Sequence, residues 1–287
     1  MSLLEVKNLS FGYSRATPFE IQALKDVSFN IDEGELVSVI GHTGSGKSTL
    51  MQMLNALLTP EQGEVLLEGK NIHESKTSAY EARFRVGLCF QYPEYQLFCE
   101  TCAEDIAFGP KNMGLPPDEI RERVKQAARF VGLDEALLDH SPFDLSGGQK
   151  RRCAIAGVMA MRPKILILDE PTAGLDPAGR SAVLDMILHY RQETGATVII
   201  VTHSMEIAAA VSDRILVLNQ GALVFDSTPE EIFSHYEALV SMGLNVPSFT
   251  KIIYALQKRG LHVQNAYTAQ AAADAICAML HAEETSP

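Results

Sequence analysis

The chain has 287 residues, with 24 Lys or Arg and 36 Asp or Glu, so its formal net charge is −12. Its length suits one large domain or a domain with an appendix, and 46% hydrophobic content is typical of a globular rather than a disordered protein. The acidic balance argues against general nucleic-acid binding and against electrostatic attachment to anionic lipid. With five cysteines, no leader-like start and a longest apolar run of nine residues, 153–161, we expect a soluble, intracellular protein.

Short apolar segments alternate with longer helical patterns along the chain, as in an α/β domain. Five segments are continuous apolar runs, the pattern of strands buried on both faces of a mostly parallel sheet. They are Leu36–Ile40, Val86–Phe90, Ile165–Leu168, Val198–Val201 and Ile215–Leu218. Two further stretches, Leu3–Phe11 and Glu64–Glu68, fit strands nearer an edge or in an antiparallel piece.

The pattern changes between residues 92 and 160, where prolines separate helical patches such as Asp118–Val131 and no strand is evident. We interpret this stretch as a helical subdomain inserted in an α/β domain that spans residues 1–220. Residues 221–287 then form a small, mostly helical appendix, whose first helix opens with a capping box at Thr228. Its apolar stripes need a surface that covers them.

A glycine-rich segment, Gly41–Ser48 (GHTGSGKS), directly follows the first buried strand and opens a predicted helix, Thr49–Leu58. Its glycines let the backbone wrap around phosphate with consecutive N–H groups pointing inward. The helix N-terminus adds partial positive charge, Lys47 reaches the β- and γ-phosphates, and the Ser48 hydroxyl suits Mg²⁺. The bare pattern arises by chance on the order of once per hundred such chains, and the strand before it lowers that further. The segment therefore predicts a phosphate-binding loop.

Two adjacent acids, Asp169 and Glu170, end the apolar strand Ile165–Leu168. At the carboxyl end of a buried strand they face the crevice where α/β sheets bind ligands. Asp169 suits Mg²⁺, and Glu170 is placed to orient or deprotonate an attacking water. A helix-capping pair is the alternative, which the upstream phosphate-binding loop disfavours.

Leu145–Gln149 (LSGGQ) places a serine and two glycines just before the strongly helical stretch Lys150–Met161. This is a second backbone nest aimed at an anion, although a simple turn and cap is the alternative. One nucleotide does not need two such nests from one chain. We therefore infer that the second nest serves a nucleotide held by another subunit.

In this order the three motifs resemble those of the ATP-binding cassette (ABC) ATPases, over roughly residues 3–226. The resemblance implies ATP and Mg²⁺ as cofactors, and two cassettes paired head-to-tail with each ATP between the phosphate-binding loop of one and LSGGQ of the other. The nucleotide contacts that it implies are Tyr13, Gly41, His42, Thr43, Gly44, Ser45, Gly46, Lys47, Ser48, Thr49, Ser146, Gly147, Gly148, Gln149 and Asp176.

The resemblance also implies individual roles. Tyr13 matches the aromatic that stacks on adenine, although an aromatic at this point of an edge strand is otherwise usually core. Gln91 matches the glutamine that contacts Mg²⁺ or water and couples to the transport partner. His203 matches the histidine that touches the γ-phosphate, and Asp176 the acid of the loop that crosses the dimer interface. The implied catalytic set is Glu170, His203 and Gln91, and the implied metal set is Ser48, Gln91 and Asp169.

Finer motifs are most similar to the energy-coupling factor (ECF) transporter ATPases, and the Thr17–Glu20 insert to the second of their paired ATPases. The other segments that carry this likeness are Gly41–Gly46, Phe90–Phe98 and Gln149–Gly157. The resemblance implies a peripheral protein on the cytoplasmic face of the cell membrane that energises uptake of vitamins or of nickel or cobalt ions. The implied partners are a second ATPase subunit, an integral membrane coupling subunit and a substrate-binding membrane subunit, with no nucleic acid. A sister ATPase is favoured over a homodimer, with the appendix in contact between the two ATPase subunits.

Alternatives remain open at this point. The chain could be the ATPase of another ABC importer class, a non-transport ABC ATPase, or a nucleotide-binding regulator without turnover. No residue identifies the transported solute. The Lys150–Arg152 cluster is more typical of a solvated or phosphate-adjacent face than of a nucleic-acid patch, and the lone Cys99-x-x-Cys102 pair is too small for a structural zinc site.

Overall fold

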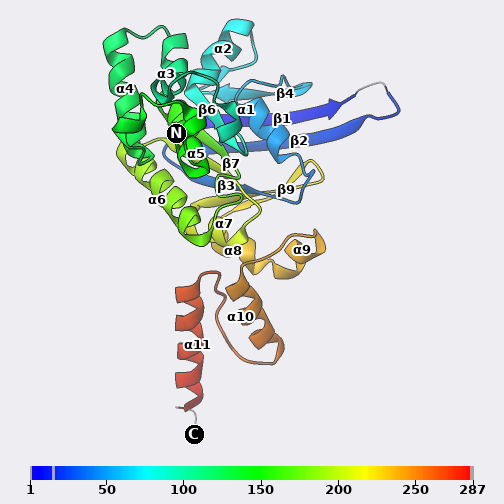
Figure 1. Ribbon diagram of the computed structural model, residues 1–287. Helices are drawn as coiled ribbons and strands as arrows, with labels where there is room; N and C mark the ends of the chain where they lie inside the picture. Colours follow the sequence, from blue (N-terminus) through cyan, green and yellow to red (C-terminus); the bar gives the residue numbers. More distant parts are fainter. Residues whose placement is uncertain (1, 15–16, 285–287) are drawn as a thin grey trace.

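A six-stranded sheet carries the centre of the fold in the computed structural model, which describes residues 2–14 and 17–284 (Figure 1). The strand order is β10-β9-β3-β8-β7-β6, and every neighbouring pair is parallel except β9 with β10. The strands are β3 (Leu36–Ile40), β6 (Val86–Cys89), β7 (Ile165–Asp169), β8 (Thr197–Val201), β9 (Arg214–Asn219) and β10 (Ala222–Ser227). The predicted mostly parallel sheet is confirmed, because apolar runs such as Leu36–Ile40 are buried on both faces.

A second, four-stranded sheet is antiparallel and has the order β2-β1-β4-β5. Its strands are β1 (Ser2–Tyr13), β2 (Ile21–Asp32), β4 (Gln62–Leu67) and β5 (Lys70–Asn71). The antiparallel piece predicted around Leu3–Phe11 and Glu64–Glu68 is confirmed, with β1 and β4 paired directly. Helix α1 (Lys47–Leu54) packs between the two sheets through buried residues such as Leu50 and Met53.

The predicted helix Thr49–Leu58 is shorter and begins earlier, at Lys47. It ends at Leu54 because Ala56 takes a left-handed backbone conformation, with φ 56°, which an α-helix cannot contain. The apolar residues that follow Leu54 suggested a longer helix, but they lie in a turn.

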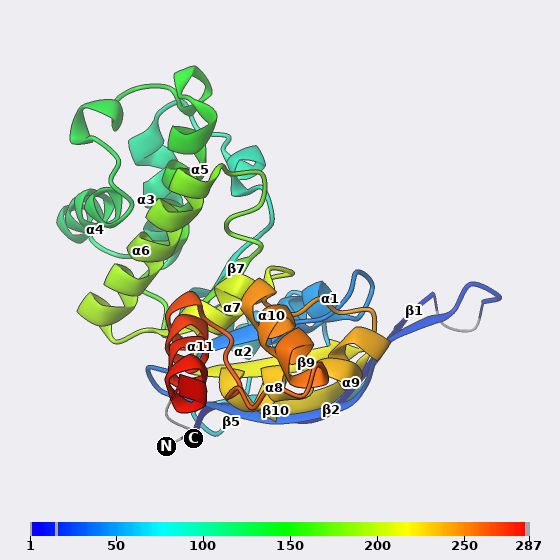
Figure 2. The ribbon, with the colours of Figure 1, turned by 90° about the horizontal axis from the view of Figure 1, so that it is seen from below.

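Helices and short 3₁₀ turns fill the stretch between β6 and β7 in the described residues. Helix α2 (Lys76–Arg85) precedes β6, and the stretch itself holds α3 (Cys102–Asn112), α4 (Pro117–Phe130) and α5 (Gly147–Met159). These three helices share an apolar core that includes Ile106, Ala128 and Ala156. In Figure 2 they form a lobe to one side of the two sheets, with α6 (Pro177–Thr194) beside them.

The C-terminal part packs against one face of the six-stranded sheet, over β3 and β9. Its helices are α8 (Pro229–Ser234), α9 (Tyr236–Ser241), α10 (Ser248–Lys258) and α11 (Ala269–Glu284). Ile232 and Phe233 of α8 are buried against Met205 and Ala208 of α7 (Met205–Val211) and against Ile215 of β9. Helices α10 and α11 have a small core of their own around Ile253 and Ala272.

The predicted division at 220/221 falls inside a β-hairpin and is wrong at that point. Gln220 and Gly221, with φ of 49° and 84°, form the two-residue turn that joins β9 to β10. The glycine-containing turn suggested the end of the domain, but the next strand returns along β9. The core sheet therefore continues to Ser227.

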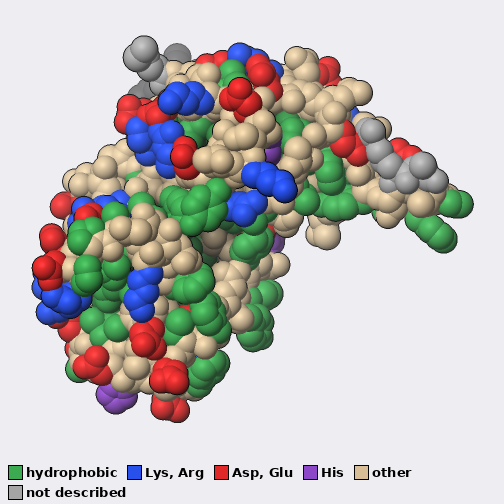
Figure 3. Space-filling model, turned by 90° about the horizontal axis from the view of Figure 1, so that it is seen from above, with side chains coloured by type: hydrophobic (Ala, Val, Ile, Leu, Met, Phe, Trp, Pro, Cys, Tyr) green, Lys and Arg blue, Asp and Glu red, His purple; other side chains and the backbone are tan. Residues whose placement is uncertain are grey.

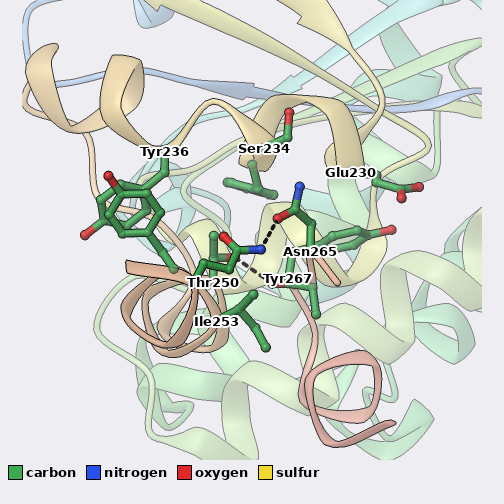
Figure 4. A pocket seen from close by; sticks show the side chains of 11 residues that line it. Glu230, Ser234, Tyr236, Thr250, Ile253, Asn265 and Tyr267 are labelled. Atoms are coloured by element: carbon green, nitrogen blue, oxygen red, sulfur yellow. Dashed lines mark hydrogen bonds between the residues drawn. The ribbon is translucent and has the colours of Figure 1, made fainter. Parts of the chain in front are cut away.

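A hollow lies between α8, α9 and α10, and Figure 4 shows its lining. Its polar side chains bond within the fold: Thr250 Oγ1 donates to the Ala266 carbonyl at 3.1 Å, and Gln257 Nε2 donates to Asn265 Oδ1 at 3.0 Å. These bonds hold the segment after α10 against that helix.

Candidate functional site

The segment Gly41–Gly46 forms the loop between β3 and α1, and two of its glycines cannot be replaced by a larger residue. A Cβ on Gly46, whose φ is 101°, would lie 2.4 Å from the Ala23 carbonyl oxygen. A Cβ on Gly41 would lie 2.3 Å from the Leu218 carbonyl oxygen. The loop is therefore held tightly between β2 and β9 on one side, while its other side lines a cleft.

Lys47, the first residue of α1, folds back over this loop. Its Nζ donates hydrogen bonds to the carbonyl oxygens of Gly41 at 2.7 Å and His42 at 2.9 Å. Burial lowers the pKa of Lys47, and the nearby carboxylates of Glu170 and Asp169 partly oppose this shift. A cation thus stands at the mouth of a loop of backbone amides, an arrangement suited to polyphosphate.

Ser48 and Asp169 face each other across the same cleft. The Ser48 hydroxyl donates to Asp169 Oδ2 at 3.1 Å, because the start of α1 and the end of β7 meet at the carboxyl edge of the sheet. Desolvation raises the pKa of Asp169, and the Ser48 hydrogen bond partly opposes that shift. A hydroxyl and a carboxylate oxygen beside a phosphate-binding loop fit a hard divalent cation such as Mg²⁺.

Glu170 and His203 form a second polar pair, at the ends of the neighbouring strands β7 and β8. His203 Nδ1 donates to Glu170 Oε1 over 2.7 Å, with the histidine side chain 75% exposed and the glutamate 11% exposed. The backbone of Glu170 has φ 50°, and its N–H donates to the Val201 carbonyl at 2.9 Å. This strained position at a site is stabilised by the strand beside it.

Tyr13 and Gln91 complete the cleft. The Tyr13 hydroxyl lies 3.1 Å from Thr49 Oγ1, and its ring packs edge-on against Phe11. Gln91 lies just after β6 and is exposed. The predicted residues that line this one cleft are Tyr13, Gly41, His42, Thr43, Gly44, Gly46, Lys47, Ser48, Thr49, Gln91, Asp169, Glu170 and His203. Ser45 is buried beneath the loop instead.

The remaining predicted residues lie elsewhere. Ser146 is the N-cap of α5, where its hydroxyl accepts from the Gln149 N–H and Gln149 Oε1 accepts from the Ser146 N–H. Asp176 caps α6, with Oδ1 accepting from the Gly179 N–H at 2.8 Å. Across the described part of the chain, the lining of the cleft contains none of the residues 145–149 and not Asp176. The two nests are therefore separate in one chain.

Comparison with known proteins places this geometry in a family. The family model described as ABC transporter matches residues 24–173, which contain the phosphate-binding loop, LSGGQ and the Asp169–Glu170 pair. The chain belongs to the ABC transporter family. We refer to residues 2–227 as the cassette and to the helices after them as the appendix.

Curated relatives make the assignment finer. The cassette and appendix together are 51% identical to the energy-coupling factor transporter ATP-binding protein EcfA2 of Caldanaerobacter subterraneus, covering 91% of this chain and 91% of that protein. The protein of the same description from Clostridium perfringens is also 51% identical, covering 91% and 92% of the two chains. The likeness to ECF transporter ATPases predicted from the finer motifs is confirmed.

Two solved structures are similar to this chain and support its place in the ABC transporter family. The cbiO1 protein of Clostridium perfringens, described as part of the ABC transporter complex cbiONQ, is 39% identical with a TM-score of 0.75, covering 90% of this chain and 97% of that one. The ATP-binding cassette MJ0796, solved as a dimer bound to ADP and Pi, is 30% identical with a TM-score of 0.71, covering 79% and 98%.

Sequence reasoning missed part of the cleft wall. Ile21 and Ala23 of β2, Met205 of α7 and residues 243–245 of the appendix also line it. The alternation of apolar and polar residues over Val27–Asp32, in the second half of β2, was the available signal. For residues 243–245 no local pattern exists, because the appendix reaches the cassette only through tertiary packing of residues such as Leu244.

Proposed function

We propose that this chain is the ATP-binding and hydrolysing subunit that energises an ECF-type importer, by the reaction ATP + H₂O → ADP + phosphate. The observation that carries the proposal is the single cleft that unites the amide loop, Lys47, the Ser48–Asp169 pair and the Glu170–His203 pair. Phosphoryl transfer depends mainly on positioning and on stabilising charge, and these groups supply both.

Each group has a distinct role in the proposal. The loop amides and Lys47 bind the β- and γ-phosphates, and the Tyr13 ring stacks on adenine. Ser48, Asp169 and Gln91 would hold Mg²⁺, which would supply positive charge to neutralise the phosphate oxygens. Glu170 accepts a proton from the attacking water, and His203 orients Glu170 through their hydrogen bond and contacts the γ-phosphate.

A second ATPase subunit completes the site in this proposal. Gly147 and Gly148 are exposed, and a Cβ on either would meet no atom within 4 Å, so their nest is open to a partner. Asp176 lies at the start of α6, in the loop that follows Glu170. The dimeric state of the related cassette MJ0796 supports this arrangement, and the Thr17–Glu20 insert favours a sister ATPase over a second copy. The appendix adds contact between the two subunits.

An integral membrane coupling subunit and a substrate-binding membrane subunit are the remaining proposed partners, and they place the chain peripherally at the cytoplasmic face of the membrane. Throughout the described ranges, no helix is both long enough and apolar enough to cross a bilayer. A groove next to Gln91 offers a docking surface. Its apolar lining comes from both the sheet part and the helical lobe of the cassette, and includes Leu57, Phe84, Phe98 and Phe108. Figure 3 shows apolar side chains at the surface on this side of the molecule.

The transported solute is proposed only by class, as a vitamin or a nickel or cobalt ion, because it would be bound by the membrane subunits. The test is co-purification of the tagged chain from membranes, with mass spectrometry of the bound proteins and an ATPase assay of the complex. We expect a second ATPase and two integral membrane proteins. Recovery of ribosomal or chromosomal proteins in their place would contradict the proposal. Recovery of the membrane subunits of another importer class would keep the ATPase function and contradict the ECF assignment.

A further inference from the structure

Arg151 is a buried charge in the helix that follows the LSGGQ nest. It is only 5% exposed, so of the two alternatives for Lys150–Arg152, a solvated or a phosphate-adjacent face, the solvated one is wrong for its central residue. Its Nη1 donates to the Ala173 carbonyl at 2.8 Å. Its Nε and Nη2 face the two carboxylate oxygens of Glu94, at 3.3 and 3.5 Å. A guanidinium has the planar fork that two separate partners require at once, whereas a lysine does not.

The two partners of Arg151 belong to different functional segments. Glu94 lies in the 3₁₀ turn Pro93–Gln96, which begins two residues after Gln91. Ala173 lies in the loop between Glu170 and Asp176, and its N–H donates to the Glu170 carbonyl at 3.0 Å. A continuous chain of polar contacts therefore runs from the turn, through Arg151, to the backbone of the proposed catalytic base.

The turn itself has an inner and an outer side. Pro93 and Leu97 are buried and Glu94 reaches inward to Arg151. Tyr95 and Phe98 are exposed, at 85% and 60%, and Phe98 lies in the groove proposed for the membrane subunit. A partner bound to these aromatic side chains would therefore contact the segment that carries Glu94.

We propose that Arg151 is a positioning residue that transmits docking of a membrane partner on the turn 92–98 to the loop 173–176 and so to Glu170. The inference rests on the proposed docking surface. A buried ion pair can often be replaced by apolar groups without loss of stability. We therefore assign the Arg151–Glu94 pair a role in coupling the membrane partner to Glu170, and not in folding alone.

The experiment uses the purified complex and compares its ATPase rate with that of the ATPase pair alone. Glu94→Gln and Arg151→Met are each expected to lower stimulation by the partner roughly tenfold, with ATP affinity kept. Both also lower the melting temperature, since each leaves a buried group unpaired. The double variant is expected to regain part of the stability, since the Ala173 carbonyl still lacks its donor, but not the stimulation. Arg121→Met, which removes an exposed charge on α4, is the matched control. It should leave the stimulation by the partner and the melting temperature unchanged.

A second readout needs no membrane partner. In the full chain, Glu94→Gln should increase hydrogen exchange at the Ala173 amide, although Glu94 does not bond to that residue. Unchanged exchange there, or a double variant that regains stimulation along with stability, overturns the inference. A wild-type complex without any stimulation contradicts the proposed function instead, and leaves the exchange experiment to decide the role of Arg151.

Discussion

The two backbone nests of this chain differ in how they are completed. The nest at Gly41–Gly46 is enclosed by its own chain, with β2 and β9 so near that two of its glycines admit no Cβ, and Lys47 bonds across it. The nest at Ser146–Gly148 has the same kind of exposed amides at a helix N-terminus, but a Cβ on Gly147 or Gly148 meets nothing nearby.

In the proposed function, this difference makes the first nest the half-site supplied by this chain and the second a surface offered to a partner. Packing within the chain defines the first, so we expect it to bind a triphosphate without the partner. The second has its own capping hydrogen bonds satisfied between Ser146 and Gln149, which stabilise the start of α5 while it faces solvent. Such a preformed surface binds its ligand without an ordering cost.

The largest effect is expected from Glu170→Gln, which keeps both nests and removes the base. Hydrolysis should fall on the order of a thousandfold, while ATP binding persists because neither nest has changed. The unhydrolysed nucleotide should then hold the two ATPases together, which size-exclusion chromatography with and without ATP would detect. Parental turnover in this variant would show that Glu170 is not the base.

Gly148→Asp alters the open nest alone. The new side chain has space in this chain, and an acid in the first turn of a helix is compatible with its dipole, so the melting temperature should stay the same. A carboxylate facing the partner's phosphates should lower turnover of the assembled pair by a few hundredfold. ATP binding to the isolated chain should be unaffected, as measured by titration. A Gly148→Ala variant separates the effect of charge from that of bulk.

Lys47→Ala alters the enclosed nest alone. In contrast to Gly148→Asp, it should change ATP binding to the isolated chain. Loss of a charged donor beside the phosphates is expected to weaken ATP binding to the isolated chain by about a hundredfold. The surface at Ser146–Gly148 should still support turnover of a nucleotide held by an unmodified partner. If both variants weakened binding equally, the two nests would not be distinct in function.

The sequence predicted the enclosed nest better than its surroundings for a physical reason. Continuous apolar strands, a glycine loop and two acids at a strand end are local patterns, and the structure brings thirteen of the predicted site residues to one cleft. The strand β2 was missed because charged residues such as Lys25 and Asp26 interrupt its apolar alternation. The burial of Arg151 could not be predicted, because it depends on Glu94 and Ala173, which lie far away in the sequence.

The end of the cassette was misplaced for a similar reason. A turn such as Gln220–Gly221 has the same local signature whether it closes a domain or joins two strands. Only the pairing of β10 with β9 distinguishes the two. Tertiary contacts likewise bring residues 243–245 of the appendix to the cleft, through the buried side chain of Leu244.

The most direct measurement is a structure of the assembled ATPase pair in which Glu170→Gln retains ATP and Mg²⁺. We expect the Ser146 hydroxyl and the amides of Gly147 and Gly148 to lie within hydrogen-bonding distance, about 3 Å, of the γ-phosphate bound by the lysine of the other subunit. The opposite result is a closed, nucleotide-loaded pair in which these groups face solvent. It would contradict the shared site on which the proposed function depends.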